Sequence, residues 1–463
     1  MLFQTPTRWP NCSNSNPFET CRTAAPCPIA IAIAMTTPAL SLDQIAERLQ
    51  GYDPQALPAS QVNAFLAQLV QPVREQETVP LMQAHGRILA QDVVSPISVP
   101  PHDNSAMDGY ALRGAELLTG QVTHFKVVGT AFAGAAWQGS VQAGECVRIM
   151  TGAIMPAGLN TVAPQEMVKV DGDTVHIPHG LLQAGDNRRL LGEDLMAGQP
   201  ALRAGTRLAP AACGLLASLG LPSVNVWRRP KVAYFSTGDE ILSLGEAPRE
   251  GAVYDSNRYT VAGLVQALGC ELIDMGVVRD EPAALEQAFV DAAAKADAII
   301  TSGGVSVGEA DHTKAMMKKL GDVAFWRIAM RPGRPMAVGR IKRGERSAVL
   351  FGLPGNPVAV MVTFAAFVRP ALQQLMGWQA PALPLLKAKS TEALRKKPGR
   401  TEYQRGIVST SAAGELQVSI TGNQGSGVLS SMVQANGLIV LGHAQGNVAV
   451  GDEVDVMMFD GHL

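Results

Sequence analysis

The sequence predicts a multidomain α/β protein, and three observations lead to that prediction. Strand-like and helix-like apolar runs alternate between about residues 230 and 376, which is typical of a doubly wound, mainly parallel sheet. Short β-type runs separated by glycines occupy about 86–184 and the chain after 377. At 463 residues the chain is too long for one core, because a domain usually holds about 100 to 200 residues.

The composition is that of an ordinary globular protein, with 47% hydrophobic and 17% charged residues. A formal net charge of -2, from 38 basic and 40 acidic residues, gives no overall attraction to nucleic acid or to an anionic membrane. We expect a soluble, cytoplasmic protein with no nucleic-acid or membrane partner, since no apolar run approaches the roughly 20 residues that span a bilayer. The six cysteines have no Cys-x-x-Cys spacing and are expected to be reduced thiols.

Residues 1–40 differ from the rest of the chain. The segment is rich in Pro, Asn and Thr and shows no helical periodicity. Its apolar run at 29–34 has no well-placed positive charge and no clear cleavage site after it, as a signal peptide would have. We expect a disordered extension, or a translation start assigned too far upstream, in preference to a targeting segment.

Two amphipathic helices are expected next, in a helix-rich scaffold domain formed by 41–85 together with 185–228. Residues Ser41 to Gln44 have the spacing of a capping box, and apolar residues then recur at i, i+3, i+4 and i+7. The same periodicity from Val62 to Leu69 predicts the second helix. A helical pattern at 213–219 is expected to return and pack on these first helices.

Residues 86–184 would then form an inserted β-rich domain. Its strands are expected at 125–128, 145–150 and 161–163. After Gly377 the pattern becomes β-type again, so 379–463 are predicted to form a small C-terminal β-barrel.

The alternating region, 229–378, is predicted to be the α/β domain. Ser256 is expected to cap a helix that Gly269 stops, Pro282 to open another, and a long helix to run from about 357 to 376. Its strands are expected at 232–235, 272–278, 297–300, 323–328 and 348–351.

The loop after the 297–300 run carries phosphate-type donors and carboxyl groups. Gly303 and Gly304 allow close approach of a ligand to backbone N–H groups, while Ser302 and Ser306 add hydroxyl donors. Glu309 and Asp311 offer oxygen ligands suited to a hard cation such as magnesium. The same residues also fit an ordinary strand-to-helix turn whose Asp311 caps a helix starting near Thr313. The loop alone does not decide between these two interpretations.

Three further strand ends in this domain carry polar residues, at 236–240, 279–280 and 352–357. Because the carboxyl ends of parallel strands lie along one sheet edge, these residues are expected to meet. Gly355 is expected to take a positive φ, and the helix that begins at Pro357 to face a bound anion. Each segment also has a plain structural interpretation, as a helix cap or a turn, but four polar ends on one edge favour a binding site.

Three arginines follow, at 327, 331 and 334. They fit a solvated basic edge, and beside carboxyl groups and glycine loops they also fit a site that holds oxyanions. A metal with anion donors suggests phosphoryl or phosphoanhydride chemistry.

Taken together, these motifs resemble the molybdopterin molybdenumtransferases, the MoeA and gephyrin-E family. The resemblance runs in order from about residue 40 to the C-terminus. The segments that carry it, besides the loop at 301–314, are Asn104 to Ala111, Met150 to Ala153, Gly192 to Asp194, Ser236 to Glu240, Asp255 to Asn257 and Gly352 to Pro357.

The resemblance implies an enzyme that inserts molybdate into adenylylated molybdopterin, releases AMP and requires magnesium. It implies metal binding by Glu240, Asp280 and Asp311. It also implies a homodimer in which Asp108 and Thr151 complete the partner's site. Molybdate would be held by Arg327, Arg331 and Ser426, and the rest of the substrate by Thr237, Gly238, Ser302, Gly303, Gly304, Ser306, Gly355, Asn356 and Pro357.

Relatives often have lysine where this chain has the three arginines, so the charge is kept while a planar fork replaces a compact ammonium. The resemblance also allows contact with a molybdopterin adenylyltransferase. Two alternative functions are a molybdopterin adenylyltransferase, against which the β-rich insertion at 86–184 argues, and a non-enzymatic scaffold, for which no sequence feature speaks.

Overall fold

The structure is a computed structural model that describes residues 40–305, 312–344, 346–381 and 383–459. All of these belong to one unit, Leu40–Leu463. The expectation for residues 1–40 concerns a segment of which residues 1–39 lie outside the described residues. Ser306, Glu309 and Asp311 also lie outside them.

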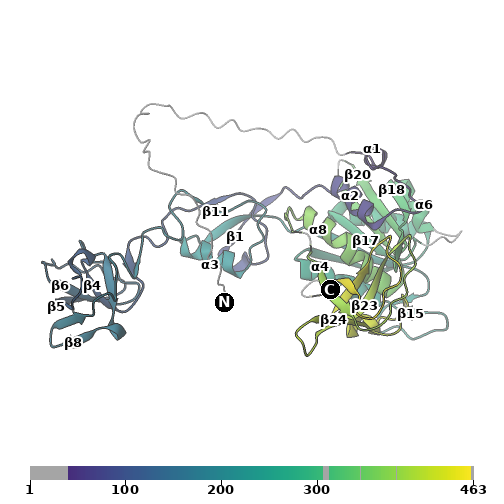
Figure 1. Cartoon of the computed structure of the whole chain (residues 1–463). Helices are drawn as coiled ribbons and strands as arrows, with labels where there is room; N and C mark the ends of the chain where they lie inside the picture. Colours follow the sequence, from purple (N-terminus) through teal and green to yellow (C-terminus); the bar gives the residue numbers. More distant parts are fainter. Residues whose placement is uncertain (1–39, 306–311, 345, 382, 460–463) are drawn as a thin grey trace. The chain divides into compact units, whose positions relative to one another are not determined.

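A six-stranded sheet forms the centre of the α/β region (Figure 1). Its order is β16-β13-β17-β21-β20-β18; the first four strands run parallel, β20 pairs antiparallel with β21, and β18 pairs antiparallel with β20. The prediction of a mainly parallel sheet is therefore confirmed. The bounds are β13 (Lys231–Thr237), β16 (Glu271–Val278), β17 (Ala298–Ser302), β18 (Gly321–Arg327), β20 (Pro335–Arg343) and β21 (Arg346–Leu353).

Strand β20 was not predicted, because Pro335 and Gly339 weaken its strand pattern. The glycine is required where β18 passes, since a Cβ at Gly339 would lie 2.1 Å from the carbonyl oxygen of Asp322. A residue that interrupts the sequence pattern is thus the one that lets the two strands approach.

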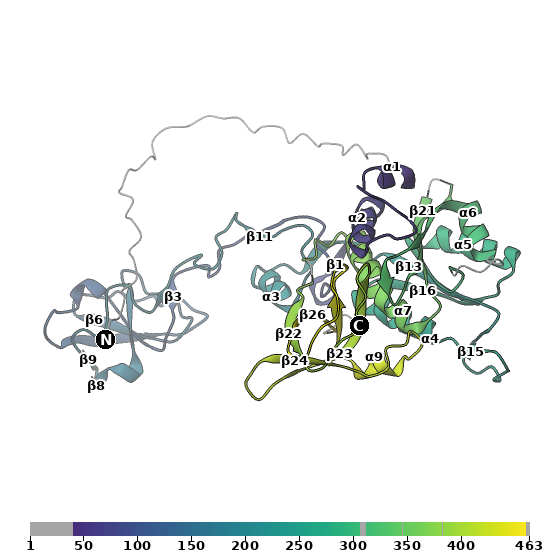
Figure 2. The same cartoon turned by 45° about the vertical axis from the view of Figure 1, so that its right-hand side comes forward.

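Helices cover both faces of this sheet, as a doubly wound fold requires (Figure 2). Val232 and Tyr234 of β13 pack in one core with α4 (Ser256–Leu268), α7 (Pro357–Thr363) and α8 (Arg369–Leu375). Ala233 and Phe235 point to the opposite core, with α5 (Pro282–Lys295) and α6 (His312–Leu320). The alternation of side chains along a strand therefore separates the two layers.

The long helix predicted at 357–376 is present as α7, a π-helical turn (Phe364–Val368) and α8. By length and composition alone, Pro357–Leu375 could cross a membrane. However, 83% of its most apolar window is buried inside the protein, as expected for a core helix, so this is weak evidence.

The first two helices belong to the same core as the α/β sheet. Helix α1 (Leu42–Glu47) starts with the predicted capping box of Ser41 and Gln44. Helix α2 (Ala59–Leu69) buries its apolar face against α8 and the π-helical turn.

The third helix, α3 (Pro210–Ser218), packs instead in a separate cluster with η1 (Leu81–Gln83) and β11 (Pro200–Leu202). The expectation that the 213–219 helix packs on the first helices is thus wrong. The apolar stripe of α2 is already covered by the long helix of the α/β region.

The chain passes to and from the β-rich region through three nested antiparallel pairs. They are β1 (Gln76–Pro80) with β12 (Ser223–Trp227), β2 (Val93–Val94) with β11, and β3 (Asn104–Ser105) with β10 (Arg188–Arg189). Beyond them lies a six-stranded sheet of order β7-β4-β6-β5-β9-β8. Its strands are β4 (Gly109–Leu112), β5 (Thr123–Ala131), β6 (Glu145–Ile149), β7 (Thr161–Pro164), β8 (Lys169–Asp171) and β9 (Thr174–Ile177).

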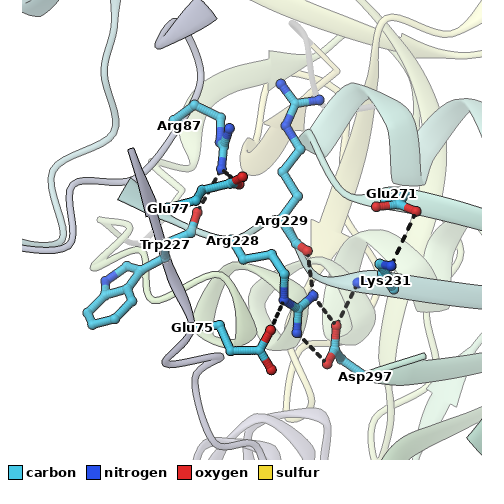
Figure 3. A network of polar contacts seen from close by, with 9 residues as sticks. All are labelled: Glu75, Glu77, Arg87, Trp227, Arg228, Arg229, Lys231, Glu271 and Asp297. Carbon is cyan, nitrogen blue, oxygen red and sulfur yellow. Dashed lines mark hydrogen bonds and ion pairs between the residues drawn. The ribbon is translucent and has the colours of Figure 1, made fainter. Parts of the chain in front are cut away.

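Arg228 connects the β1–β12 pair to the start of the α/β sheet (Figure 3). Its guanidinium makes two hydrogen bonds of 3.0 Å to Asp297, and its Nε donates to Glu75 at 2.6 Å. Asp297 also accepts from the backbone N–H of Lys231 at 2.7 Å, at the first residue of β13. Asp297 is the main cause that raises the pKa of Arg228 above its ordinary value. The bidentate pair and the bond from Lys231 therefore link the end of β12 to the starts of β13 and β17.

The C-terminal strands close into a five-stranded barrel, as predicted. The order β23-β24-β22-β26-β25 becomes a ring because β23 also pairs with β25. A short strand, β19 (Met330–Arg331), joins β23 in parallel, and α9 (Ser430–Gln434) lies between β24 and β25 in the chain. The barrel strands are β22 (Leu386–Ser390), β23 (Thr401–Thr410), β24 (Leu416–Ile420), β25 (Gly437–Leu441) and β26 (Glu453–Met458).

Candidate active site

A cavity of about 900 Å³ lies at the carboxyl ends of β13, β16, β17 and β21. These four strands are neighbours in the sheet and parallel, so the structure brings all four predicted polar strand ends together. The residues predicted for a site that line this cavity are Thr237, Gly238, Glu240, Asp280, Ser302, Gly303, Gly304, Arg331, Gly355, Asn356, Pro357 and Ser426.

The paired glycines of the β17 loop are required by space as well as by backbone conformation. Gly303 has φ +92°, and a Cβ there would lie 2.4 Å from the carbonyl oxygen of Thr237. Gly304 has φ +63°, and its Cβ would lie 2.5 Å from the Cβ of Thr313. The N–H of Gly303 donates to the carbonyl of Leu353 at 3.1 Å, so this N–H connects two strands instead of facing a ligand.

Gly355 in the β21 loop does not take the positive φ that was expected. It is absent from the residues with a left-handed backbone, and the nearest atom to a Cβ there would be the Cα of Gly303 at 4.0 Å. Asn356 precedes α7 in an extended conformation, without a capping bond from its side chain. Its amide therefore lines the cavity with no structural duty at the helix end.

Three hydroxyl groups form a buried triangle under the β13 and β17 ends. The Tyr234 oxygen lies 2.8 Å from that of Ser236 and 2.7 Å from that of Ser302, and the two serine oxygens are 3.2 Å apart. Three O–H donors can all be used within such a ring. Burial is the main cause that raises the pKa of the Tyr234 hydroxyl above its ordinary value, and the charge of Asp255 raises it further. This hydroxyl therefore stays protonated.

The carboxyl group of Glu240 is placed by a small excursion after β13. Strands β14 (Ile241–Leu242) and β15 (Val253–Tyr254) pair in parallel, and the N–H of Val253 donates to the carbonyl of Glu240 at 2.9 Å. The Glu240 side chain lies over Gly238, where a Cβ would meet its Oε2 at 2.5 Å. Gly238 therefore leaves room for the carboxyl group at the cavity.

Asp280 follows β16 and lines the same cavity. Its Oδ1 accepts a hydrogen bond of 3.3 Å from the hydroxyl of Thr313 in α6. Asp311 and Ser306, the remaining predicted residues of this part, lie outside the described residues. Within the described ranges, which exclude Asp311, no three His, Cys, Asp or Glu residues are grouped closely enough to hold a metal ion.

The basic part of the cavity comes from β19 and the barrel. Arg331 in β19 lines the cavity, and Ser426 reaches it from the loop after β24. The carbonyl of Ser426 accepts from the N–H of Val358 at 3.1 Å, which ties this loop to α7. Arg327 at the end of β18 is exposed and is not among the residues that line the cavity.

Arg405 in β23 holds the loop that carries Ser426. It is 1% exposed, and its guanidinium donates to the carbonyls of Asn423 at 3.2 Å and Gly425 at 3.0 Å and to the hydroxyl of Ser431 at 3.0 Å. Burial lowers the pKa of Arg405, and the nearby charge of Arg331 lowers it further. Two guanidinium groups thus lie close together beside the cavity, which favours an anionic ligand.

Asp108 and Thr151 lie together in the β-rich region, not in this cavity. Asp108 Oδ1 accepts from the Thr151 hydroxyl at 2.6 Å and from its N–H at 2.7 Å. These bonds, the hydroxyl first, lower the pKa of Asp108. The structure therefore joins the two predicted residues to each other.

Sequence reasoning missed several residues of the cavity. Asp255 and Asn257 line it, although their segment was expected only to cap a helix at Ser256 and to carry part of the family resemblance, with no binding role. The cap is in fact Asp255, whose Oδ1 accepts from the N–H of Arg258 at 3.0 Å. Gln424, which lines the cavity, and Arg405, which holds the loop beside it, gave no local signal, because the closed barrel is needed to bring them to the site.

The cavity combines carboxyl groups, hydroxyls and a cationic part at the end of a parallel sheet. Such a site can bind an anionic ligand by Arg331 and Ser426 while carboxyl oxygens bind a hard cation or accept from N–H groups. This is the arrangement that phosphoanhydride chemistry needs.

Comparison with known proteins gives a family match for three stretches of the chain. Residues 57–220 match the MoeA N-terminal region (domain I and II), 233–374 match a probable molybdopterin binding domain, and 387–459 match the MoeA C-terminal region (domain IV). The structure is similar to the molybdopterin biosynthesis moeA protein from Pyrococcus horikoshii OT3, with a TM-score of 0.75 and 28% identity over 87% of this chain and 100% of that one.

Two curated relatives cover most of the chain. A molybdopterin molybdenumtransferase of Haemophilus influenzae is 43% identical over 84% of this chain and 95% of the relative. One from Nostoc sp. is 37% identical over 83% of this chain and 89% of the relative. These matches confirm the resemblance seen in the motifs, and the chain belongs to the molybdopterin molybdenumtransferase (MoeA) family.

Proposed function

We propose that this protein inserts molybdate into adenylylated molybdopterin and releases AMP, which yields the molybdenum cofactor. The observation that carries the proposal is the cavity of about 900 Å³, which joins the polar ends of four parallel strands to Arg331 of β19 and to the barrel loop that carries Ser426. The curated relatives, named molybdopterin molybdenumtransferase, support the same activity.

In this proposal Arg331 and Ser426 bind molybdate. A guanidinium fork and a hydroxyl are suitable donors for an oxyanion, and the nearby charge of Arg405 adds to the attraction. Arg405 also keeps Ser426 in place through its bonds to the loop carbonyls. Gly304 and Asn356 line the part of the cavity where the phosphates of the substrate would lie.

Magnesium is the metal that the proposal requires. Glu240 and Asp280 supply carboxylate oxygens, the ligands that magnesium prefers, and Asp311 is the third member of the predicted set. Magnesium, when bound, would neutralise negative charge on the phosphoanhydride during its cleavage. Glu240 and Asp280 would also orient the bound substrate.

We further propose a homodimer in which Asp108 and Thr151 complete the partner's site. Their mutual bonds hold the two groups together in the β-rich region, where Thr151 is exposed and Asp108 is half-buried. A cytoplasmic location and contact with a molybdopterin adenylyltransferase are parts of the same proposal.

The test is to supply the purified full-length protein with adenylylated molybdopterin, molybdate and magnesium and to follow AMP release. We expect release that depends on all three components. Glu240→Gln should remove it while the thermal unfolding curve stays that of the parent protein. Absence of release from the parent protein, or full release from Glu240→Gln, would contradict the proposal.

A further inference from the structure

Two residues that line the cavity each have a buried oxygen atom without a hydrogen-bond partner among the described residues. Asp255 is 4% exposed and Asn257 8% exposed, and both line the cavity. Among the residues that the structure describes, Asp255 Oδ2 and Asn257 Oδ1 have no hydrogen-bond partner. Buried polar atoms in proteins nearly always have one, so two such atoms at one cavity indicate a surface completed by a ligand.

The other atoms of these two side chains fix their orientation. Asp255 Oδ1 is the cap of α4 and accepts from the N–H of Arg258 at 3.0 Å. Asn257 Nδ2 donates to the carbonyl of Gly355 at 2.8 Å, which only an amide nitrogen can do. The unpartnered atom is therefore an oxygen in both residues, and both oxygens can accept hydrogen bonds from donors on a ligand.

An aromatic residue of the same cavity directly precedes Asp255 in the chain. Tyr254 lines the same cavity and is 44% exposed. Its hydroxyl donates to the carbonyl of Glu246 at 2.8 Å, and its strand β15 pairs with β14. The ring is thus held in place while part of its surface remains available, and such rings stack on planar heterocycles.

These groups are unsuited to the anionic parts of a substrate. Phosphate and molybdate oxygens are acceptors, and they would meet two more acceptors at Asp255 and Asn257. Arg331 and Ser426 in the same cavity are suited to the oxyanions instead. The cavity therefore has separate places for the anionic and the N–H-bearing parts of one ligand.

We propose that Asp255 and Asn257 bind the N–H donor edge of a planar amino-substituted heterocycle in the substrate. The inference rests on the proposed function, because the substrate proposed there contains two such heterocycles. Its pterin carries an amino group next to a ring N–H, and its adenine carries one amino group. Both present the same donor chemistry to the two acceptor oxygens.

The experiment measures binding to the full-length protein by titration calorimetry with two pairs of probes. AMP is compared with IMP, and pterin-6-carboxylate with lumazine-6-carboxylate, because the second member of each pair has a carbonyl in place of the amino group. We expect the parent protein to prefer the amino form of one pair by about 10- to 100-fold, the usual effect of a hydrogen bond to a charged group. The pair that shows the preference identifies the heterocycle bound.

Asp255→Asn and Asp255→Ser should both reduce that preference by about tenfold or more. Asn and Ser cap helices about as well as Asp, so α4 should keep its start and the thermal unfolding midpoint should not fall. Asp291→Asn is the matched control. It makes the same chemical change in α5, outside the cavity lining, and should leave the preference unchanged.

Two results would overturn the inference. One is a parent protein that binds no probe or does not distinguish the members of either pair. The other is a preference that survives in both Asp255 variants. The AMP-release assay is read separately. Release with an unaltered preference in the variants refutes only the role of Asp255 and Asn257, whereas a lost preference without AMP release refutes only the proposed reaction.

Discussion

Gly303→Ala should destabilise the β17 end of the sheet far more than Gly355→Ala, although both glycines line the same cavity. At Gly303 the φ of +92° costs an L-residue roughly 1–2 kcal/mol. The new Cβ would lie 2.4 Å from the backbone oxygen of Thr237, which cannot move without disturbing β13, and such overpacking costs about 1–3 kcal/mol.

The lower entropy of the unfolded chain offsets about 0.4–1 kcal/mol of this. The net loss at Gly303 is therefore about 1–4.6 kcal/mol. At Gly355 the nearest atom is 4.0 Å away and no positive φ is required, so only the entropic gain remains. Gly355→Ala should be neutral or slightly stabilising.

Hydrogen–deuterium exchange followed by mass spectrometry measures this locally, which matters because a chain of several domains need not unfold in one step. Amides of β13 and β17 should exchange about 5- to 2,000-fold faster in Gly303→Ala, since each 1.4 kcal/mol is tenfold. Exchange at the parent rate in Gly303→Ala, or equal acceleration by Gly355→Ala, would refute the steric reasoning.

Three other predictions concern single side chains. Arg405→Lys keeps the charge but cannot reach three acceptors at once, so it should lower the unfolding temperature and raise the KM for molybdate about tenfold, with a smaller effect on kcat. Thr151→Val removes one of the two bonds that depress the pKa of Asp108, so an NMR titration should show this pKa rising toward 3.8. Iodoacetamide at neutral pH should label Cys213 before Cys146 and Cys270. These two cysteines are buried, and burial raises the pKa of each thiol to about 12.

Each of these has a result that would contradict it. For Arg405 it is unchanged stability and KM in the lysine variant. For Asp108 the direction of the change of stability with pH is fixed. Its depressed pKa contributes stability above the unfolded-state value and loses it as pH falls through the folded value, so Thr151→Val must weaken the acid dependence of stability. For the cysteines, equal labelling in the folded protein would show that burial does not protect Cys146 and Cys270.

The sheet edge could be predicted because its signals are local. Short apolar runs followed by polar loops show strand ends, and parallel connections place those ends on one side. Gly269, which ends α4 with φ +88°, and the capping box at Ser41 are likewise set by nearest neighbours in the chain. Such features depend on a few adjacent residues.

Other features depend on contacts distant in sequence and could not be predicted. Arg405 holds the Ser426 loop only because β23 pairs with β24 and β25 in a closed barrel. Asp255 gives the signal of a helix cap, and only the folded cavity shows that its second oxygen remains buried without a described partner. Helix α2 packs on α8 because their apolar stripes meet in space, which periodicity alone cannot specify.

The pairing of β19 with β23 limits how this protein can be divided. Met330 and Arg331 lie opposite Thr401 and Glu402, so a residue of the cavity belongs to the same sheet as the barrel. A fragment ending near 378 would leave that short strand unpaired and would also lack Ser426. In chimeras between relatives, a crossover between β19 and β23 would therefore combine an arginine from one parent with a supporting strand from another. Exchange of the α/β region and the barrel as one block should be better tolerated than exchange of either alone.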